Sequence, residues 1–121
     1  DLVGKTGIVH GLYVSLKEQI LQAHPDLLPN PKKFYIGYQM ADNWRNIFNV
    51  NKTRNRLVIH FTRSKPSDFD DPQEKLKPVE RARENYGQDI AMLSVKDEKD
   101  IRYSILIIQQ AYERFVKEFG N

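Results

Sequence analysis

Cysteine is absent from the 121 residues of this chain. Disulfide bonds and metal sites with thiolate ligands are therefore excluded, and the composition favours a reducing, cytoplasmic setting. No apolar run approaches the roughly 20 residues that a membrane-spanning helix needs, so we expect no membrane partner. The chain also starts without methionine. From this we expect a C-terminal fragment of a longer protein, with an N-terminal domain of the same polypeptide as its neighbour.

Motifs for catalysis and for cofactor binding are equally sparse. The segment Gly4–Thr6 contains the lysine and threonine of a phosphate-binding loop, but it lacks the first glycine and the preceding strand. No serine nucleophile motif occurs, and His10, His24 and His60 have no spacing typical of a metal site. We therefore predict no catalytic residue, no cofactor and no metal site.

Two long helices follow from the hydrophobic spacing. Over residues 6–23 apolar side chains recur at steps of three and four, with Thr6 as the expected N-terminal cap. A longer stripe of the same kind predicts a helix over about residues 101–119. Asp97 or Asp100 is expected to open that helix, because acidic residues stabilise a helix N-terminus.

Period-two alternation predicts a sheet between these helices. Four strands are predicted, the first three in an antiparallel meander, at residues 33–40, 44–50, 56–63 and 89–95. The proline-rich segment 24–31 and the polar segment 65–78 are predicted connections, and a short helix is expected from Pro78 to a stop at Gly87. The inward face of the meander is predicted to carry Phe34, Ile36, Tyr38, Met40, Trp44, Asn46, Phe48, Val50, Leu57, Ile59 and Phe61. The prediction is thus a single α+β domain, with about four antiparallel strands and both terminal helices packed on one face.

Positive charge is concentrated in one third of the chain. Between residues 30 and 65 there are eight lysines and arginines and a single acid, Asp42. If the helices cover one face of the sheet, the opposite face presents cations beside an aromatic ring and amides, which can contact phosphates and stack a base. The candidate surface for nucleic acid or for a partner consists of Tyr35, Arg45, Lys52, Arg54, Arg56, His60, Arg63 and Lys65. A solvated face that prevents aggregation, or a docking face for a sister domain, stays open as an alternative.

Two other functions are compatible with the sequence. Asp68, Asp70 and Asp71, together with His60, could belong to a metal-dependent nuclease or hydrolase, because closely spaced carboxylates bind divalent cations. The same loop lacks the central glycine of a calcium-binding loop and is bounded by prolines, so a solvated turn is the simpler interpretation. A homodimer that pairs through the last helix or an edge strand is the other alternative.

Several segments, taken in order, resemble a known family. They are "LYVSLKEQIL", "KKFYIGYQMADNWRNI", "RLVIHF", "DDP" and "DEKDIRYSILIIQQAYE". They are similar to the uncharacterised C-terminal domain of bacterial and archaeal "predicted transport proteins", which also occurs behind restriction-related and nuclease-like modules. The resemblance covers most of the chain. It implies an accessory module rather than a catalyst, with a role near DNA by analogy.

Overall fold

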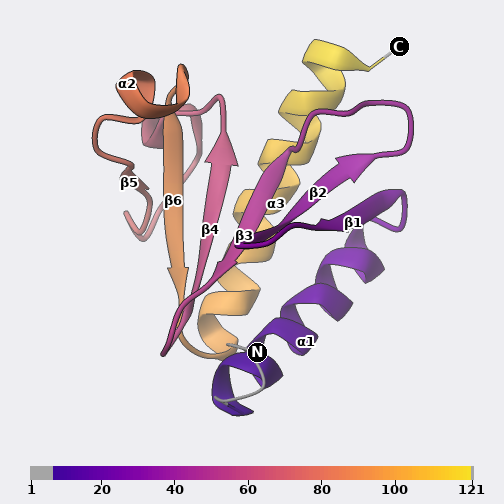
Figure 1. The fold of residues 1–121 in the computed structure, drawn as a ribbon, viewed down its shortest axis with the longest axis vertical. Coiled ribbons are helices and arrows are strands. Elements are labelled where there is room, and N and C mark those ends of the chain that lie inside the picture. Colours follow the sequence, from indigo (N-terminus) through magenta and orange to yellow (C-terminus); the bar gives the residue numbers. More distant parts are fainter. Residues whose placement is uncertain (1–6, 121) are drawn as a thin grey trace.

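A six-stranded antiparallel sheet and three α-helices form residues 7–120, the part of the chain that this computed structural model describes (Figure 1). The spatial order is β1-β2-β3-β4-β6-β5, with β1 Leu27–Pro31, β2 Tyr35–Met40, β3 Phe48–Lys52, β4 Leu57–Thr62, β5 Lys77–Pro78 and β6 Ile90–Val95. The predicted α+β class is confirmed. The expectation of about four strands is wrong, because it omitted β1 and β5.

β1 lies in the segment whose prolines predicted a connection. It pairs antiparallel with β2, and Leu27 stands opposite Met40. Pro29 and Pro31 have no backbone N–H, so they fit only an edge strand, where one row of donors needs no partner. β5, at the other edge, is two residues long and also contains a proline, Pro78. Both edges of the sheet are therefore poor templates for pairing with a second chain.

The two long helices, α1 Gly7–Ala23 and α3 Glu98–Phe119, lie together behind the sheet in Figure 1. α3 begins as predicted, since the Asp97 carboxylate accepts a hydrogen bond from the Asp100 N–H at 2.9 Å. The expected cap Thr6 and the segment Gly4–Thr6 lie outside the described residues. Among residues 7–120, no helix is long and apolar enough to cross a membrane.

The short helix α2, Ala82–Tyr86, ends where the sequence predicted. Gly87 has a φ of 73°, the left-handed conformation that glycine adopts readily at a helix C-terminus. Pro78 belongs to β5 rather than to the first helical turn, so the predicted start of this helix is wrong. The residues between Pro78 and α2 lead the chain from one edge of the sheet back towards β6.

The core lies between the sheet and the two long helices. Ile36, Val50, Ile59 and Leu93 are cross-strand neighbours in β2, β3, β4 and β6, and all four are buried. From the other side, α1 contributes Val9, Leu12, Leu16 and Ile20, and α3 contributes Ile101, Ile107, Ile108, Ala111 and Phe115. Burial of these apolar side chains is the main stabilising contribution to the fold.

Three of the predicted inward residues lie elsewhere. Phe34 and Trp44 are each 78% exposed, because β2 begins at Tyr35 and β3 begins only at Phe48, which leaves both rings in loops. Asn46 belongs to the same loop as Trp44. The alternation at residues 44–47 therefore imitates a strand without forming one.

Candidate nucleic-acid interface

The face of the sheet that points away from α1 and α3, here called the open face, carries polar side chains at alternate positions. Asn49 stands opposite His60 in the β3–β4 pair, and both alternate with fully buried neighbours. The same alternation places on this face Tyr35, Gln39, Asn49, Asn51, Arg56, His60, Thr62 and Ser94. The sequence prediction of one covered and one polar face therefore holds for β2, β3 and β4.

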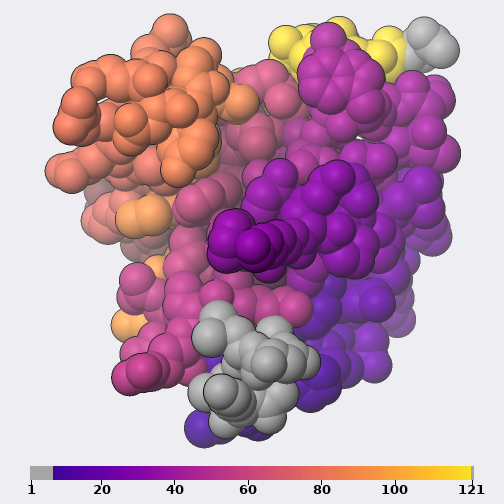
Figure 2. Space-filling view, in the orientation of Figure 1, coloured from indigo at the N-terminus to yellow at the C-terminus, as the bar shows by residue number. Residues whose placement is uncertain are grey.

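A hollow of about 360 Å³ lies on the open face, here called the open-face hollow. In Figure 2 it lies between the orange α2 segment and the purple turn that joins β1 to β2. Its lining residues are Asn30, Lys32, Tyr35, Trp44, Arg45, Asn46, Asn49, Thr62, Arg63 and Gln88. The lining thus combines three cations, two aromatic rings and four amides, and none of the lining residues is a carboxylate.

A single glycine allows the loop between β2 and β3 to form one side of this hollow. A Cβ atom at Gly37 would lie only 2.4 Å from Nδ2 of Asn46, so the Asn46 amide occupies the space above the glycine. Nδ2 of Asn46 donates a hydrogen bond to Oδ1 of Asn49 at 2.9 Å, and the Ile47 N–H donates to the Tyr38 carbonyl at 2.8 Å. The loop is therefore folded back over β2, which holds Trp44 at the hollow.

Arg45 is held between two aromatic rings beside the hollow. Its guanidinium carbon lies 4.8 Å from the centroid of the Trp44 ring and 4.4 Å from that of Phe119 on α3. These distances are typical of cation–π contacts, which fix the side chain without neutralising its charge. Trp44 itself is 78% exposed, so most of its ring surface stays accessible to a ligand.

Arg63 contributes a second guanidinium to the same region. It lies 5.5 Å from the centroid of Phe119, and its Nη2 donates to the Asn46 carbonyl at 2.8 Å. Burial lowers the pKa of Arg63, the Glu118 carboxylate opposes that effect, and the charge of Arg45 adds to it. In the part of the chain that the structure describes, neither arginine has a carboxylate oxygen within 4.0 Å. Positive potential at this edge of the hollow is therefore left available for an anion.

Three of the eight predicted surface residues line the hollow, and two others lie on the open face outside its lining. Tyr35, Arg45 and Arg63 line it. His60 neighbours Asn49 on the open face, and Arg56 precedes β4 on the same face. Burial lowers the pKa of His60, so its imidazole is neutral at pH 7 and contributes hydrogen bonding rather than charge.

Lys52, Arg54 and Lys65 are not brought to the hollow. Lys52 shares the helix side of β3 with Phe48 and Val50, and its Nζ lies 4.7 Å from the centroid of the Tyr13 ring on α1. Its expected place on the open face is therefore wrong, because β3 extends through Lys52 instead of ending before it. Arg54 lies in the turn between β3 and β4, and Lys65 precedes the 3-10 turn Pro66–Asp68.

Several hollow residues were not among the predicted set. They are Asn30, Lys32, Trp44, Asn46, Asn49, Thr62 and Gln88. One signal in the sequence could have indicated the loop: Gly37 interrupts an otherwise bulky strand, and a glycine in a strand often marks the close approach of another segment. Gln88 could not have been found in this way, since it precedes β6 and meets the Arg63 N–H from 25 residues further along the chain.

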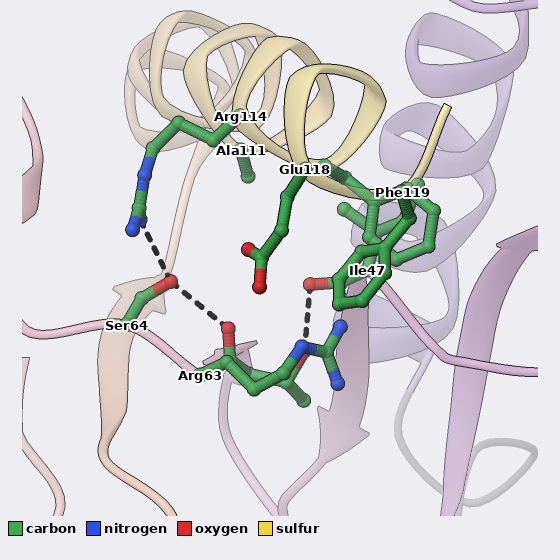
Figure 3. A pocket seen from close by; sticks show the side chains of 9 residues that line it. Ile47, Arg63, Ser64, Ala111, Arg114, Glu118 and Phe119 are labelled. Carbon is green, nitrogen blue, oxygen red and sulfur yellow. Dashed lines mark hydrogen bonds between the residues drawn. The ribbon is translucent and has the colours of Figure 1, made fainter. Parts of the chain in front are cut away.

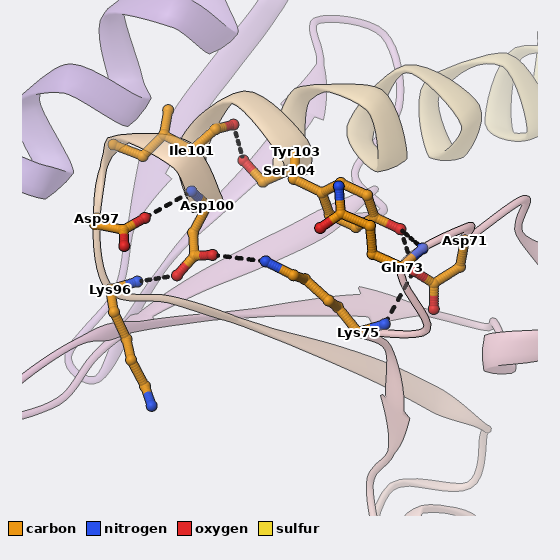
Figure 4. Close-up of polar contacts among 9 residues, drawn as sticks. All are labelled: Asp71, Gln73, Lys75, Lys96, Asp97, Asp100, Ile101, Tyr103 and Ser104. Atoms are coloured by element: carbon orange, nitrogen blue, oxygen red, sulfur yellow. Dashed lines mark hydrogen bonds and ion pairs between the residues drawn. The ribbon is translucent and has the colours of Figure 1, made fainter.

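In the 68–71 segment, the carboxylates of Asp68 and Asp71 have structural partners. The Asp71 carboxylate accepts hydrogen bonds from the Lys75 and Leu76 N–H groups, at 3.1 and 2.9 Å, and from the Tyr103 hydroxyl on α3 (Figure 4). Burial raises the pKa of Asp71, but these hydrogen bonds outweigh it, and the pKa lies below its ordinary value. Asp68 accepts from the Lys65 N–H at 2.8 Å.

The geometry around these aspartates favours no metal-dependent reaction. Asp71 packs against α3 through Tyr103, whereas His60 lies on the open face on the other side of the sheet. Within residues 7–120, no group of three or more His, Asp or Glu side chains is arranged to hold a metal ion. The hydrolase alternative therefore gains no support from the positions of its own candidate residues.

No protein-family model, curated protein or solved structure matches the chain. The resemblance to the C-terminal domain of the "predicted transport proteins" thus stays a prediction. A function for the domain has to be argued from the open face and its hollow.

Proposed function

We propose that this domain binds single-stranded nucleic acid in the open-face hollow, as a non-catalytic accessory module of a larger protein. One observation carries the proposal: the hollow combines three cations, two aromatic rings and four amides, with no carboxylate among its lining residues. The accessory role is the one that the family resemblance implies, and it forms part of the same proposal.

Each type of side chain in the hollow has a counterpart in a nucleotide. Lys32, Arg45 and Arg63 can neutralise backbone phosphates. Trp44 offers an exposed ring on which a base can stack, an interaction worth about 1–3 kcal/mol per base. The amides of Asn30 and Asn49 can donate to and accept from base edges, which carry both kinds of group.

The shape of the site favours a single strand over a duplex. The binding groups line a depression on a sheet, with Trp44 on the loop between β2 and β3 and Gln88 after α2. A duplex keeps its bases paired and stacked, so it cannot insert a base into such a depression, whereas a single strand can.

Dimerisation through the sheet has less support than binding of nucleic acid. β1 contains two prolines in five residues, and β5 is only two residues long. Strands of this kind offer few free donors for pairing with another chain. A partner protein that occupies the open face is an alternative outcome of the experiment that follows.

Fluorescence anisotropy with a labelled oligothymidylate of about 12 nucleotides tests the proposal, since single-strand sites span roughly 4–16 nucleotides. We expect saturable binding at low salt and much weaker binding of the matching duplex. Trp44→Ala should weaken binding about tenfold, the equivalent of about 1.4 kcal/mol of lost stacking. Tyr86→Ala is the matched control, because Tyr86 is an aromatic residue on α2 that is 62% exposed and outside the hollow lining. Absence of binding to DNA and RNA single strands at low salt would refute the proposal and favour a protein partner.

A further inference from the structure

A second, smaller hollow adjoins the open-face hollow, between the end of β4 and the last turns of α3 (Figure 3). Thr62 and Arg63 line both hollows. The free space in the smaller one is about 20 Å³, enough for roughly one water molecule. The two hollows therefore meet at the end of β4.

Two guanidinium groups from different elements meet at the smaller hollow. Arg63 follows β4 and donates one hydrogen bond, to the Asn46 carbonyl. Arg114, on α3, donates through Nη1 to Oγ of Ser64 at 3.0 Å, and its Nη2 lies 3.5 Å from the Asp68 carboxylate. A guanidinium carries five N–H donors, so both side chains keep donors that can bind an added anion.

Glu118 places a carboxylate between these two arginines. In Figure 3 its side chain points into the hollow, with Arg114 and Ser64 on one side and Arg63 on the other. The carboxylate raises the pKa of Arg63 against the effect of burial, yet none of its oxygens comes within 4.0 Å of a cationic nitrogen among the described residues. Glu118 is an exposed residue, so its side chain can turn into solvent at little cost.

We propose that the smaller hollow is a binding site for a phosphate monoester at the end of the bound strand. The terminal phosphate takes the place of the Glu118 carboxylate and accepts hydrogen bonds from Arg63 and Arg114. A monoester carries close to two negative charges at pH 7, whereas an internal phosphodiester carries one, so two guanidiniums bind the end more strongly. This inference rests on the proposed function, because the strand in the open-face hollow brings its terminal phosphate to Arg63.

Competition binding tests this site with three unlabelled oligothymidylates: one with a 5′-phosphate, one with a 3′-phosphate and one with neither. Each displaces the same internally labelled strand. We expect one of the two phosphorylated strands to bind about tenfold more tightly than the strand with two hydroxyl ends. Arg114→Gln should remove that preference and leave binding of the unphosphorylated strand unchanged. Glu118→Gln should increase the preference, because the Glu118 carboxylate then no longer competes with the phosphate for the two guanidiniums.

The matched control is Arg102→Gln, since Arg102 is an exposed arginine of the same helix that lies outside both hollows. It should retain the wild-type preference. Equal binding of all three strands overturns the inference and leaves the proposed function intact, and so does a preference that survives in Arg114→Gln. Failure of every strand to bind overturns the proposed function itself. If Arg114→Gln does not fold, Glu118→Gln decides: an unchanged preference in that variant contradicts a site at this position.

Discussion

Three cations line the open-face hollow, and their number determines how strongly binding should depend on salt. Each phosphate that a protein neutralises on a single strand contributes about −0.7 to the slope of log K against log salt concentration. If Lys32, Arg45 and Arg63 each contact one phosphate, the expected slope is about −2. Raising the salt concentration from about 50 to about 200 mM should then weaken binding about twentyfold.

Arg45→Gln tests the contribution of one of these contacts. The substitution removes the charge, so the slope should fall in magnitude by about 0.7, to roughly −1.4. It also removes the guanidinium that contacts the Trp44 and Phe119 rings, and affinity should therefore decrease at every salt concentration. The assay is fluorescence anisotropy of the labelled oligothymidylate over a potassium chloride series.

Arg54→Gln is the control for this experiment, because Arg54 is exposed in the turn between β3 and β4 and does not line the hollow. Its slope should remain that of the wild-type domain. Two results would refute the reasoning. A slope near zero in the wild-type domain would exclude phosphate contacts, and equal slopes for Arg45→Gln and Arg54→Gln would show that net charge acts without a defined site.

Two further predictions concern the structure around the site and its stability. Gly37→Ala places a Cβ 2.4 Å from Nδ2 of Asn46 and should displace that amide, so binding of the oligothymidylate should weaken. The lost Asn46–Asn49 hydrogen bond costs about 1 kcal/mol, but replacing a glycine within a β-strand gains a similar amount. The free energy of unfolding measured in urea should therefore hardly change. A loss of several kcal/mol in the free energy of unfolding would contradict this reasoning, because it would mean that the Asn46 side chain cannot move away from the new Cβ. His24 is 5% exposed, and burial lowers its pKa although the Asp26 and Glu113 carboxylates act in the opposite direction. As the pH falls, His24 is therefore protonated at a higher pH in the unfolded state than in the folded state. The free energy of unfolding should consequently decrease as the pH falls through the ordinary value of 6.5. Urea unfolding at pH values on both sides of 6.5 should show a weaker pH dependence for His24→Phe, and an unchanged dependence would exclude His24 as its source.

Periodicity predicted the parts of the fold that depend on local pattern. Apolar residues at steps of three and four up to Phe119 predicted α3, because one face of the helix must be buried. Apolar residues at every second position from Leu57 predicted β4, because one face of the strand must be buried. β1 was missed because Pro29 and Pro31 disfavour a strand in general. Only the position of β1 at the sheet edge makes them acceptable, and that position is a property of the whole fold.

The candidate site was predictable to a smaller extent. Alternation and charge identified Tyr35, Arg45 and Arg63, because residues on the face opposite the helices follow from the strand period. Trp44 was assigned to the core because residues 44–47 alternate like a strand. Its true place depends on the fold-back of the loop over Gly37, a contact between segments that no local pattern contains.

Trp44 provides the most direct test of nucleic-acid binding in the open-face hollow, since it is the only tryptophan in the chain. Its emission can be followed while unlabelled oligothymidylate is added at low salt. If a base stacks on the indole, the emission should be quenched to a plateau, and added salt should reverse the change. An emission that stays constant while anisotropy shows the strand to be bound would place nucleic acid elsewhere on the domain and contradict the proposed site.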